Sequence, residues 1–230
     1  MFGVSISECN FVRLFQPPSK IIDPIRNIIN SELSRRAPHQ QLKKDTIEFR
    51  LNSVDYYYES TEDEIRSKRA LNRIVRYLVN TNFKLYSVCD VTLNDGKMST
   101  FVFQEMGEYP ENDKLTSIYS ISLNEVDRIR LIGSFDEFSK ALRSILKGSW
   151  PGGIQAESDL RGAHEFRLFG VPFKSSSLAA DTVNYSMFII FLFENIKRFH
   201  RFKFIGSANL DTSDYSEIGM NTLFFKYDEA

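Results

Sequence analysis

The side chains best suited to chemistry in this sequence are charged residues that occur twice with one spacing. The tetrapeptide Glu-Phe-Arg-Leu occupies residues 48–51 and again residues 165–168, an offset of 117 positions. Arg13 and Arg130 are separated by the same offset. A glutamate between arginines could bind an anion, or its carboxylate could act as a general base. We favour a cross-strand ion pair that holds two neighbouring strands in register.

Alternation along a strand places the charges of each tetrapeptide together. Glu and Arg point to one side of the strand, and Phe and Leu point to the other. The six candidates for an ion pair or a ligand site are Arg13, Glu48, Arg50, Arg130, Glu165 and Arg167. If His164 joined the second set in a site between the copies, the protein would be an enzyme or a binder of small molecules or anions.

The other reactive side chains form no catalytic or metal-binding pattern. His39, His164 and His200 have no metal-ligand spacing to another histidine, a cysteine or a carboxylate. Cys9 and Cys89 are too few for a disulfide framework, and we expect both to be small buried hydrophobes in strands. We therefore predict no catalytic residue, no metal and no cofactor.

The single tryptophan, Trp150, lies in a glycine-containing segment, residues 148–153. No Lys-Ser or Lys-Thr follows these glycines, so the segment is not a phosphate-binding loop. A tryptophan in a loop could anchor a partner, or it could fold back over the end of a helix as a cover. The sequence supports both interpretations equally.

The offset of 117 extends beyond the tetrapeptide and indicates a tandem duplication. Between residues 5 and 51 it aligns ten identical pairs. Those outside the tetrapeptide are Ser5/Ser122, Glu8/Glu125, Arg13/Arg130, Leu14/Leu131, Arg26/Arg143 and Ile28/Ile145. We therefore expect a first repeat at residues 1–106, a linker at 107–117 and a second repeat at 118–230.

Both copies predict the same order of secondary-structure elements. Short alternating runs predict strands, and apolar residues at helical spacing predict helices. In copy one the strands fall near 2–6, 12–14, 48–51, 83–92 and 99–105, and the helices near 21–33 and 61–79. This ββαβαββ order predicts an α+β (α/β-like) fold in which each copy is a mixed sheet covered by two helices.

Composition is typical of a folded protein inside the cell. Of the 230 residues, 42% are hydrophobic and 26% are charged. The net charge of −1 creates no field that would recruit nucleic acid or an anionic membrane. The longest apolar run, residues 187–193, is far too short to span a bilayer. We expect a soluble cytoplasmic protein without a signal segment, with the nucleus as an alternative.

The two copies differ most in their second helix. Copy one has a single apolar stripe, whereas residues 185–193 of copy two are apolar on almost every side. At the offset of 117, Asn72, Arg73 and Arg76 correspond to Ile189, Ile190 and Phe193. We expect the other copy to cover the additional apolar face, with a partner chain as the alternative.

These differences favour a non-enzymatic interaction or adaptor protein that binds another protein, although a homo-oligomer is also possible. Its partner-binding residues would be Trp150, Ile189, Ile190 and Phe193. Besides the enzyme hypothesis, the basic helix of copy one could bind RNA. For its basic residues, Arg66, Lys68, Arg69, Arg73 and Arg76, we favour a solvated helix face instead.

Overall fold

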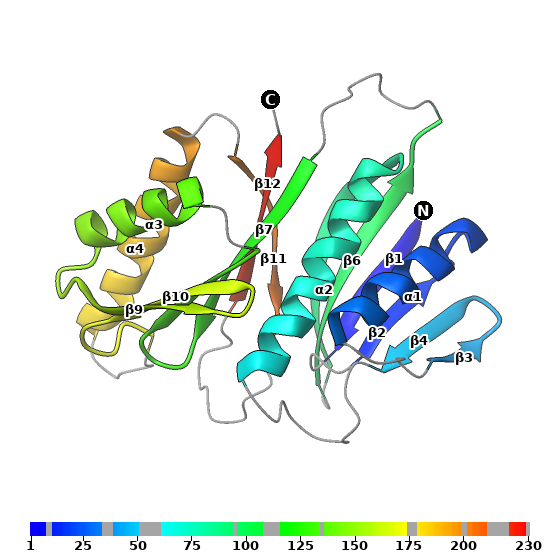
Figure 1. The fold of residues 1–230 in the computed structure, drawn as a ribbon, viewed down its shortest axis with the longest axis horizontal. Coiled ribbons are helices and arrows are strands. Elements are labelled where there is room, and N and C mark those ends of the chain that lie inside the picture. Colours follow the sequence, from blue (N-terminus) through cyan, green and yellow to red (C-terminus); the bar gives the residue numbers. More distant parts are fainter. Residues whose placement is uncertain are drawn as a thin grey trace.

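Two repeats of one α+β unit make up the computed structural model of the chain (Figure 1). The structure describes residues 1–7, 11–33, 39–50, 61–93, 96–107, 116–133, 136–173, 179–198, 202–210 and 221–228. The expected linker therefore lies largely outside the described residues.

Within the described residues, each repeat has six strands and two helices in the order ββαββαββ. The first repeat consists of β1 (Phe2–Ser7), β2 (Phe11–Phe15), α1 (Ser19–Leu33), β3 (His39–Lys43), β4 (Thr46–Arg50), α2 (Thr61–Asn80), β5 (Phe83–Leu93) and β6 (Gly96–Glu105). The second consists of β7 (Thr116–Asn124), β8 (Arg128–Ile132), α3 (Asp136–Ser149), β9 (Ile154–Leu160), β10 (Ala163–Leu168), α4 (Ala179–Arg198), β11 (Phe202–Asn209) and β12 (Asn221–Asp228).

The two sheets have the same strand order, β3-β4-β2-β1-β6-β5 in the first repeat and β9-β10-β8-β7-β12-β11 in the second. The predicted α+β class and the tandem duplication are thus confirmed. Two details of the prediction are wrong, because every strand pair is antiparallel rather than mixed, and each repeat has one strand more. The additional strands, β3 and β9, lie at sheet edges, and β9 is exposed along most of its length. A strand without a buried face has no alternating apolar pattern.

A turn with unusual backbone geometry recurs in both repeats and supports the duplication. Gln16 and Gly133, 117 residues apart, both have positive φ angles, of 52° and 81°. The Gln16 amide donates to the carbonyl of Asp45 over 2.6 Å, and the Gly133 amide donates to that of Gly162 over 3.2 Å. The two acceptors are also 117 residues apart, so each repeat closes the end of its second strand with the same hydrogen bond.

The repeats share apolar contacts and form one block. Ile118, Ala208, Leu210 and Phe224 of the second repeat are buried in the hydrophobic core of the first. Phe224 packs edge-on against Phe101, with ring centres 5.2 Å apart.

The edge strands of the two sheets, β5 and β11, approach each other closely at a glycine. A Cβ atom on Gly206 would lie 2.4 Å from a methyl group of Val88, so a larger residue would force the strands apart. Glycine permits this approach of the two sheet edges.

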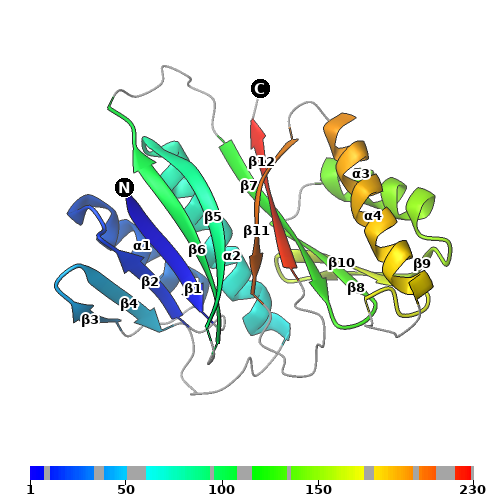
Figure 2. The same ribbon diagram turned by 180° about the vertical axis from the view of Figure 1, so that it is seen from behind.

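The helices are placed differently in the two repeats (Figures 1 and 2). α3 and α4 lie on the side of the second sheet that faces away from the first repeat, whereas α2 lies between the two repeats and contacts β7 and β8 as well as its own sheet. Among the described residues no helix is long and apolar enough to cross a membrane.

Cys89 contradicts the expectation that both cysteines are buried. It is a free, exposed thiol on β5. β5 is the edge strand of the first sheet, so part of it has no neighbour to cover it. Cys9 lies outside the described residues.

Candidate functional site

The duplicated charges form the same cross-strand ion pair in both repeats. Arg13 on β2 lies directly opposite Glu48 on β4, and its Nε atom is 2.6 Å from Glu48 Oε2. Arg130 on β8 lies directly opposite Glu165 on β10, and the corresponding distance is 2.7 Å. The geometry is that of an ion pair between neighbouring strands, at equivalent positions of the two sheets.

The two ion pairs differ in what covers them. The side chain of Arg13 is 28% exposed, whereas that of Arg130 is 2% exposed. Arg130 is covered by α2 of the first repeat, and its Nη1 atom lies 2.6 Å from Glu64 Oε2 on that helix. Docking of the repeats therefore encloses Arg130 between two carboxylates, whereas Arg13 at the equivalent position stays partly exposed.

A row of polar contacts, which we call the α2–β7 ladder, continues along the helix from Glu64. Lys68 Nζ donates to Ser122 Oγ over 2.5 Å, and Asn72 Nδ2 donates to Ser120 Oγ over 3.1 Å. At the far end the Asn80 amide group pairs with the backbone of Thr116 through two hydrogen bonds, of 2.9 and 3.0 Å. At the near end Asn124 and Lys68 both donate to Glu64.

The ladder is possible because a helix and a strand advance by similar distances between residues on the same face. Four residues of a helix rise about 6 Å, and two residues of a strand advance about 6.6 Å. The helix residues of the ladder, Glu64, Lys68, Asn72 and Asn80, are four or eight positions apart. Their partners on β7, Asn124, Ser122, Ser120 and Thr116, are two or four positions apart, so the step at Arg76 and Ile118 is skipped on both sides. Helix and strand therefore stay in register across most of the interface.

Glu64 is the acidic group of the ladder, and its side chain is 16% exposed. Its burial alone would raise the pKa of the carboxyl. The charges of Lys68 and Arg130, with hydrogen bonds from Lys68 and Asn124, instead hold the pKa below its ordinary value of 4.5. Glu64 is therefore an ionised carboxylate at neutral pH and the centre of a charge network between the repeats.

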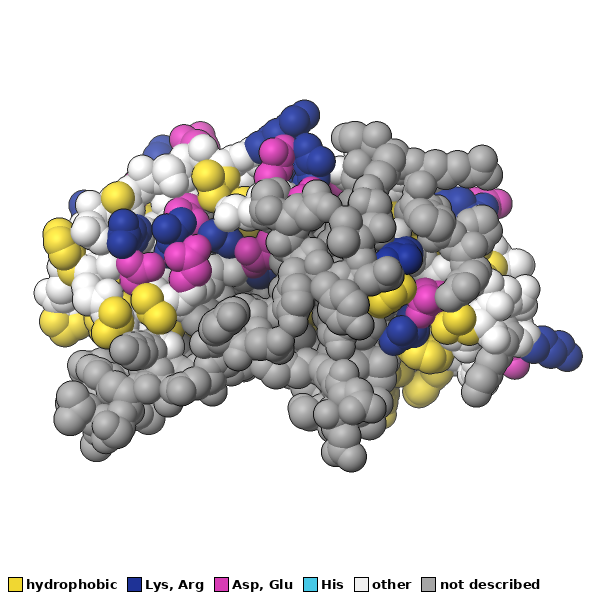
Figure 3. Space-filling view, turned by 90° about the horizontal axis from the view of Figure 1, so that it is seen from below, with side chains coloured by type: hydrophobic (Ala, Val, Ile, Leu, Met, Phe, Trp, Pro, Cys, Tyr) yellow, Lys and Arg dark blue, Asp and Glu magenta, His cyan; other side chains and the backbone are white. Residues whose placement is uncertain are grey.

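The expectation that the basic residues of copy one form a solvated helix face is wrong for Lys68, whereas Arg73 and Arg76 are exposed. Lys68 is buried, and Arg69 and Arg73 pair with Glu32 of α1. On the second repeat, seen from below, basic and acidic side chains lie beside one another (Figure 3). The described surface in this view shows no patch of one sign that would suit a nucleic-acid backbone.

Of the residues of the hypothetical enzyme site, Arg130 and Glu165 form the ion pair described above, whereas His164 points away from them. His164 lies on the opposite face of β10 from Glu165, and its ring nitrogens contact Asp159 at 2.6 Å and Glu157 at 3.2 Å. Arg167 is half-exposed and pairs with Asp127 over 2.8 Å. Among the described residues no group of His, Cys, Asp and Glu is arranged to hold a metal ion.

Two further candidates have local roles in packing. Trp150, which directly follows α3, is partly buried against the second core, and its Nε1 donates to the carbonyl of Phe169 over 2.9 Å. This is the geometry of a cover over the end of α3. The guanidinium of Arg50 lies 6.0 Å from the ring centre of Phe11 on the neighbouring strand.

The correspondence between α2 and α4 is shifted by one residue from the predicted one. Both helices span 20 residues, and their bounds are offset by 118 rather than 117 positions. This offset aligns residues that are buried in both helices: Ala70/Phe188, Ile74/Leu192 and Leu78/Ile196. Ile190, not Ile189, therefore occupies the place of Asn72, because one more residue separates Glu165 from α4 than separates Glu48 from α2.

Most of the apolar side chains of α4 are covered by other elements of the second repeat. Phe191 lies against Gly148 of α3, and Ile189 packs against the second core. Phe193 packs edge-on against Phe204 of β11, with ring centres 4.9 Å apart. Neighbouring elements of the same repeat thus cover most of the faces that the sequence shows as apolar.

The outermost face of α4 remains exposed, contrary to the expectation that the other copy covers it. Met187 is 57% exposed and Ile190 is 52% exposed, and the neighbouring Phe204 is 44% exposed. The reason is topological, because the first repeat docks on the side of the second sheet that α4 does not occupy.

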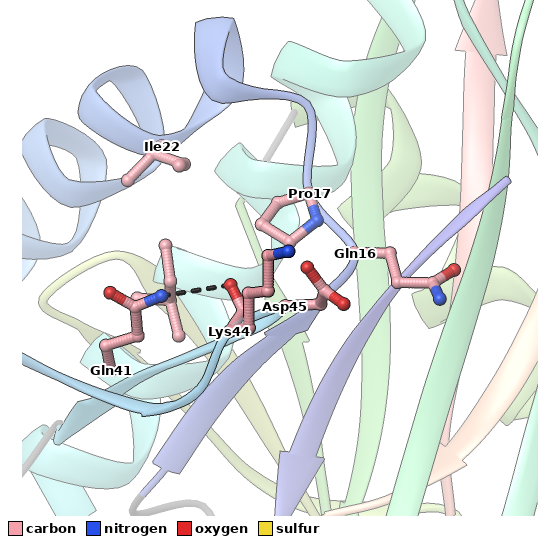
Figure 4. Close-up of a pocket in the computed structure, with 7 residues that line it drawn as sticks. Gln16, Pro17, Ile22, Gln41, Lys44 and Asp45 are labelled. Carbon is pink, nitrogen blue, oxygen red and sulfur yellow. Dashed lines mark hydrogen bonds between the residues drawn. The ribbon is translucent and has the colours of Figure 1, made fainter.

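A hollow of about 500 Å³ lies in the first repeat between the start of α1 and the β3–β4 turn (Figure 4). Its lining includes one ammonium group, from Lys44, and one carboxylate, from Asp45. Gln41 Nε2 donates to the carbonyl of Lys44 over 2.9 Å and so stabilises the turn. Among its described lining residues there is no pairing of a nucleophile with a base.

The model of one domain family matches the chain twice, at residues 1–104 and 117–226. The two matches coincide with the two repeats of the structure. No curated protein and no solved structure is a match to the chain.

Proposed function

The chain belongs to this domain family, of which it carries two copies, and on that premise we propose that it is a non-enzymatic protein-binding module. Its docking surface is the outer side of α4 together with β11, formed by Met187, Ile190, Phe193 and Phe204, which we call the α4 surface. The proposal is supported by one observation above all: three of these large apolar side chains are roughly half exposed.

The α4 surface is contiguous. Met187, Ile190 and Phe193 follow one another at a spacing of three residues, which keeps them on one side of the helix. Phe193 is in contact with Phe204, so the strip continues onto the edge of the sheet. Apolar side chains exposed in a group rather than singly are typical of interaction surfaces.

Polar residues flank the apolar centre of the outer face of α4. Ser186 and Glu194 are also exposed on this face, one turn to either side of Ile190. A partner would therefore bury Ile190 centrally and leave the two polar groups at the rim, as is usual for a protein interface. The matching surface of the partner would be about as wide as one helix and apolar at its centre.

The test is quantitative affinity capture from native cells, comparing wild type with Ile190→Glu and Met187→Glu. Each variant places a charge in an exposed position, so the fold should persist, as circular dichroism would verify. We expect both variants to lose the same subset of captured proteins. Light scattering of the purified chain would show whether that partner is a second copy.

The matched control is Tyr86→Glu, an equally exposed apolar-to-acidic change on β5 of the first repeat. It should leave the captured set as in wild type. A folded Ile190→Glu protein that retains every partner would refute the proposal.

A further inference from the structure

A groove of about 310 Å³ opens between the repeats at the point where β8 ends. β8 pairs with β7 only from Ser120 onward, so the preceding stretch of β7 faces open space on that side. One wall of this inter-repeat groove is α2, through Arg69, Arg73 and Arg76, and the other includes Ser117 and Tyr119 of β7.

The groove carries an excess of positive charge. Three of its lining residues are arginines, and no acidic residue is among the described residues that line it. Glu32 of α1 stands behind the arginines, 3.3 Å from Arg69 Nη2 and 2.7 Å from Arg73 Nη1. One buried carboxylate is thus shared by two guanidinium groups and orients both of them.

Arg73 keeps hydrogen-bonding capacity for a ligand. Its contacts with described residues, to Ser31 and Glu32, both use Nη1. The guanidinium has five N–H donors in a planar fork, so Nε and Nη2 are left for an oxyanion. The side chain is half exposed and thus accessible from solvent.

An acceptor without a partner is found in the same lining. Asn72 is buried, and its Nδ2 donates to Ser120 Oγ and to the carbonyl of Ile132, at 3.1 and 3.3 Å. Because a carbonyl can only accept, these contacts fix which end of the amide is nitrogen. The buried Oδ1 has no hydrogen-bond partner among the described residues, which is a costly arrangement unless a donor fills it.

From this combination we infer that the inter-repeat groove binds a small organic phosphate that carries hydroxyl groups. Guanidinium groups recognise phosphate in a bidentate manner, and a ligand hydroxyl supplies the donor that Asn72 Oδ1 lacks. The volume is in the range of small-molecule sites. At the corresponding positions of α4 the arginines are replaced by Met187, Phe191 and Glu194, so α4 offers no such site.

Isothermal titration calorimetry with ribose 5-phosphate, ribose and inorganic phosphate tests the inference on the full chain. We expect ribose 5-phosphate to bind about tenfold more tightly than inorganic phosphate, and ribose alone to bind too weakly to detect. The double variant Arg73→Gln/Arg76→Gln should weaken ribose 5-phosphate binding by at least about tenfold.

Arg66→Gln is the matched control, because Arg66 lies on the same helix but pairs with Glu62 and does not line the groove. It should bind ribose 5-phosphate as wild type does. If the double variant does not fold, Arg76→Gln alone replaces it, because this exposed side chain can be changed with little effect on packing.

Three results would overturn the inference. They are no binding of ribose 5-phosphate at millimolar concentration, equal affinities for ribose 5-phosphate and inorganic phosphate, and equal losses in Arg66→Gln and the double variant. The α4 variants should bind the phosphate normally, so failure here leaves the proposed protein-binding role untouched, and the reverse also holds.

Discussion

α2 and α4 occupy the same place in two copies of one unit, yet the outer face of one helix is buried and that of the other is exposed. The polar outer face of α2 is buried under β7, whereas the largely apolar outer face of α4 is exposed. Hydrophobicity of the helix therefore does not decide which face is covered. The decision is made by which side of the second sheet the first repeat docks against.

The strand opposite α2 explains why the buried face is polar. β7 presents Ser120, Ser122 and Asn124 on this side, and these groups need hydrogen-bond partners once they are removed from water. Lys68 and Asn72 donate to the two serine hydroxyl groups, and Glu64 accepts from Asn124 Nδ2. A buried polar interface of this kind favours one register, because a shift of the helix would leave several groups unpaired at once.

The largest expected effect is the loss of the arginine at the end of the ladder. Arg130→Ala removes the cation between Glu64 and Glu165 and should lower the free energy of unfolding by roughly 3–5 kcal/mol. Arg13→Ala, the same change at the equivalent, partly exposed site, should cost about 1 kcal/mol or less. Urea denaturation measures both, and equal losses would show that docking does not bury the second pair.

The second largest loss of stability is expected when Asn72 of α2 is replaced by isoleucine, the residue at the equivalent position of α4. Asn72→Ile removes the donor to Ser120 and to the Ile132 carbonyl, and should lower the free energy of unfolding by about 1–3 kcal/mol. Chemical denaturation followed by circular dichroism would measure it. A variant as stable as wild type would mean that the ladder contributes nothing that an apolar contact cannot replace.

The charge network should also give the interface a pH dependence. The pKa of Glu64 is lower in the folded chain than its ordinary value of 4.5, so its contribution to stability is complete above that value. The contribution is lost as the pH falls through the lowered pKa. Between about pH 5 and pH 3, wild type should therefore lose more stability than Glu64→Gln.

Urea midpoints measured across this pH range would show the difference. Glu62→Gln serves as the control, because Glu62 lies on the same helix turn and pairs with Arg66 at the surface. Its profile should follow that of wild type. Parallel profiles for wild type and Glu64→Gln would contradict the role assigned to the buried carboxylate.

The smallest effect is expected from the reciprocal exchange. Ile190→Asn gives α4 the residue of α2 at an exposed site, and the free energy of unfolding should change by no more than about 0.5 kcal/mol. Under the proposed function the same variant should nevertheless lose the partners that Ile190→Glu loses. Strong destabilisation by Ile190→Asn would show instead that the α4 surface is covered within the chain.

Much of each repeat could be predicted from local patterns. The apolar alternation of β1 and the helical stripe of α1 depend only on which side of an element faces its own core. The edge strand β9 could not, because it is exposed along most of its length and so leaves no alternating apolar pattern. The shift of one residue between α2 and α4 was also hidden, since sequence identity is low across that helix.

The sequence by itself determined the duplication, the α+β class and a cross-strand ion pair among the duplicated charges, because these depend on short-range periodicity and on the comparison of two copies. The structure decided that Arg13 lies opposite Glu48 and Arg130 opposite Glu165. Only the tertiary structure decided that α2 would be enclosed and α4 exposed. The residues of the ladder are spaced by four on a helix and by two on a distant strand. Each set alone looks like an ordinary solvated face, and it acquires its role only when docking excludes water between them.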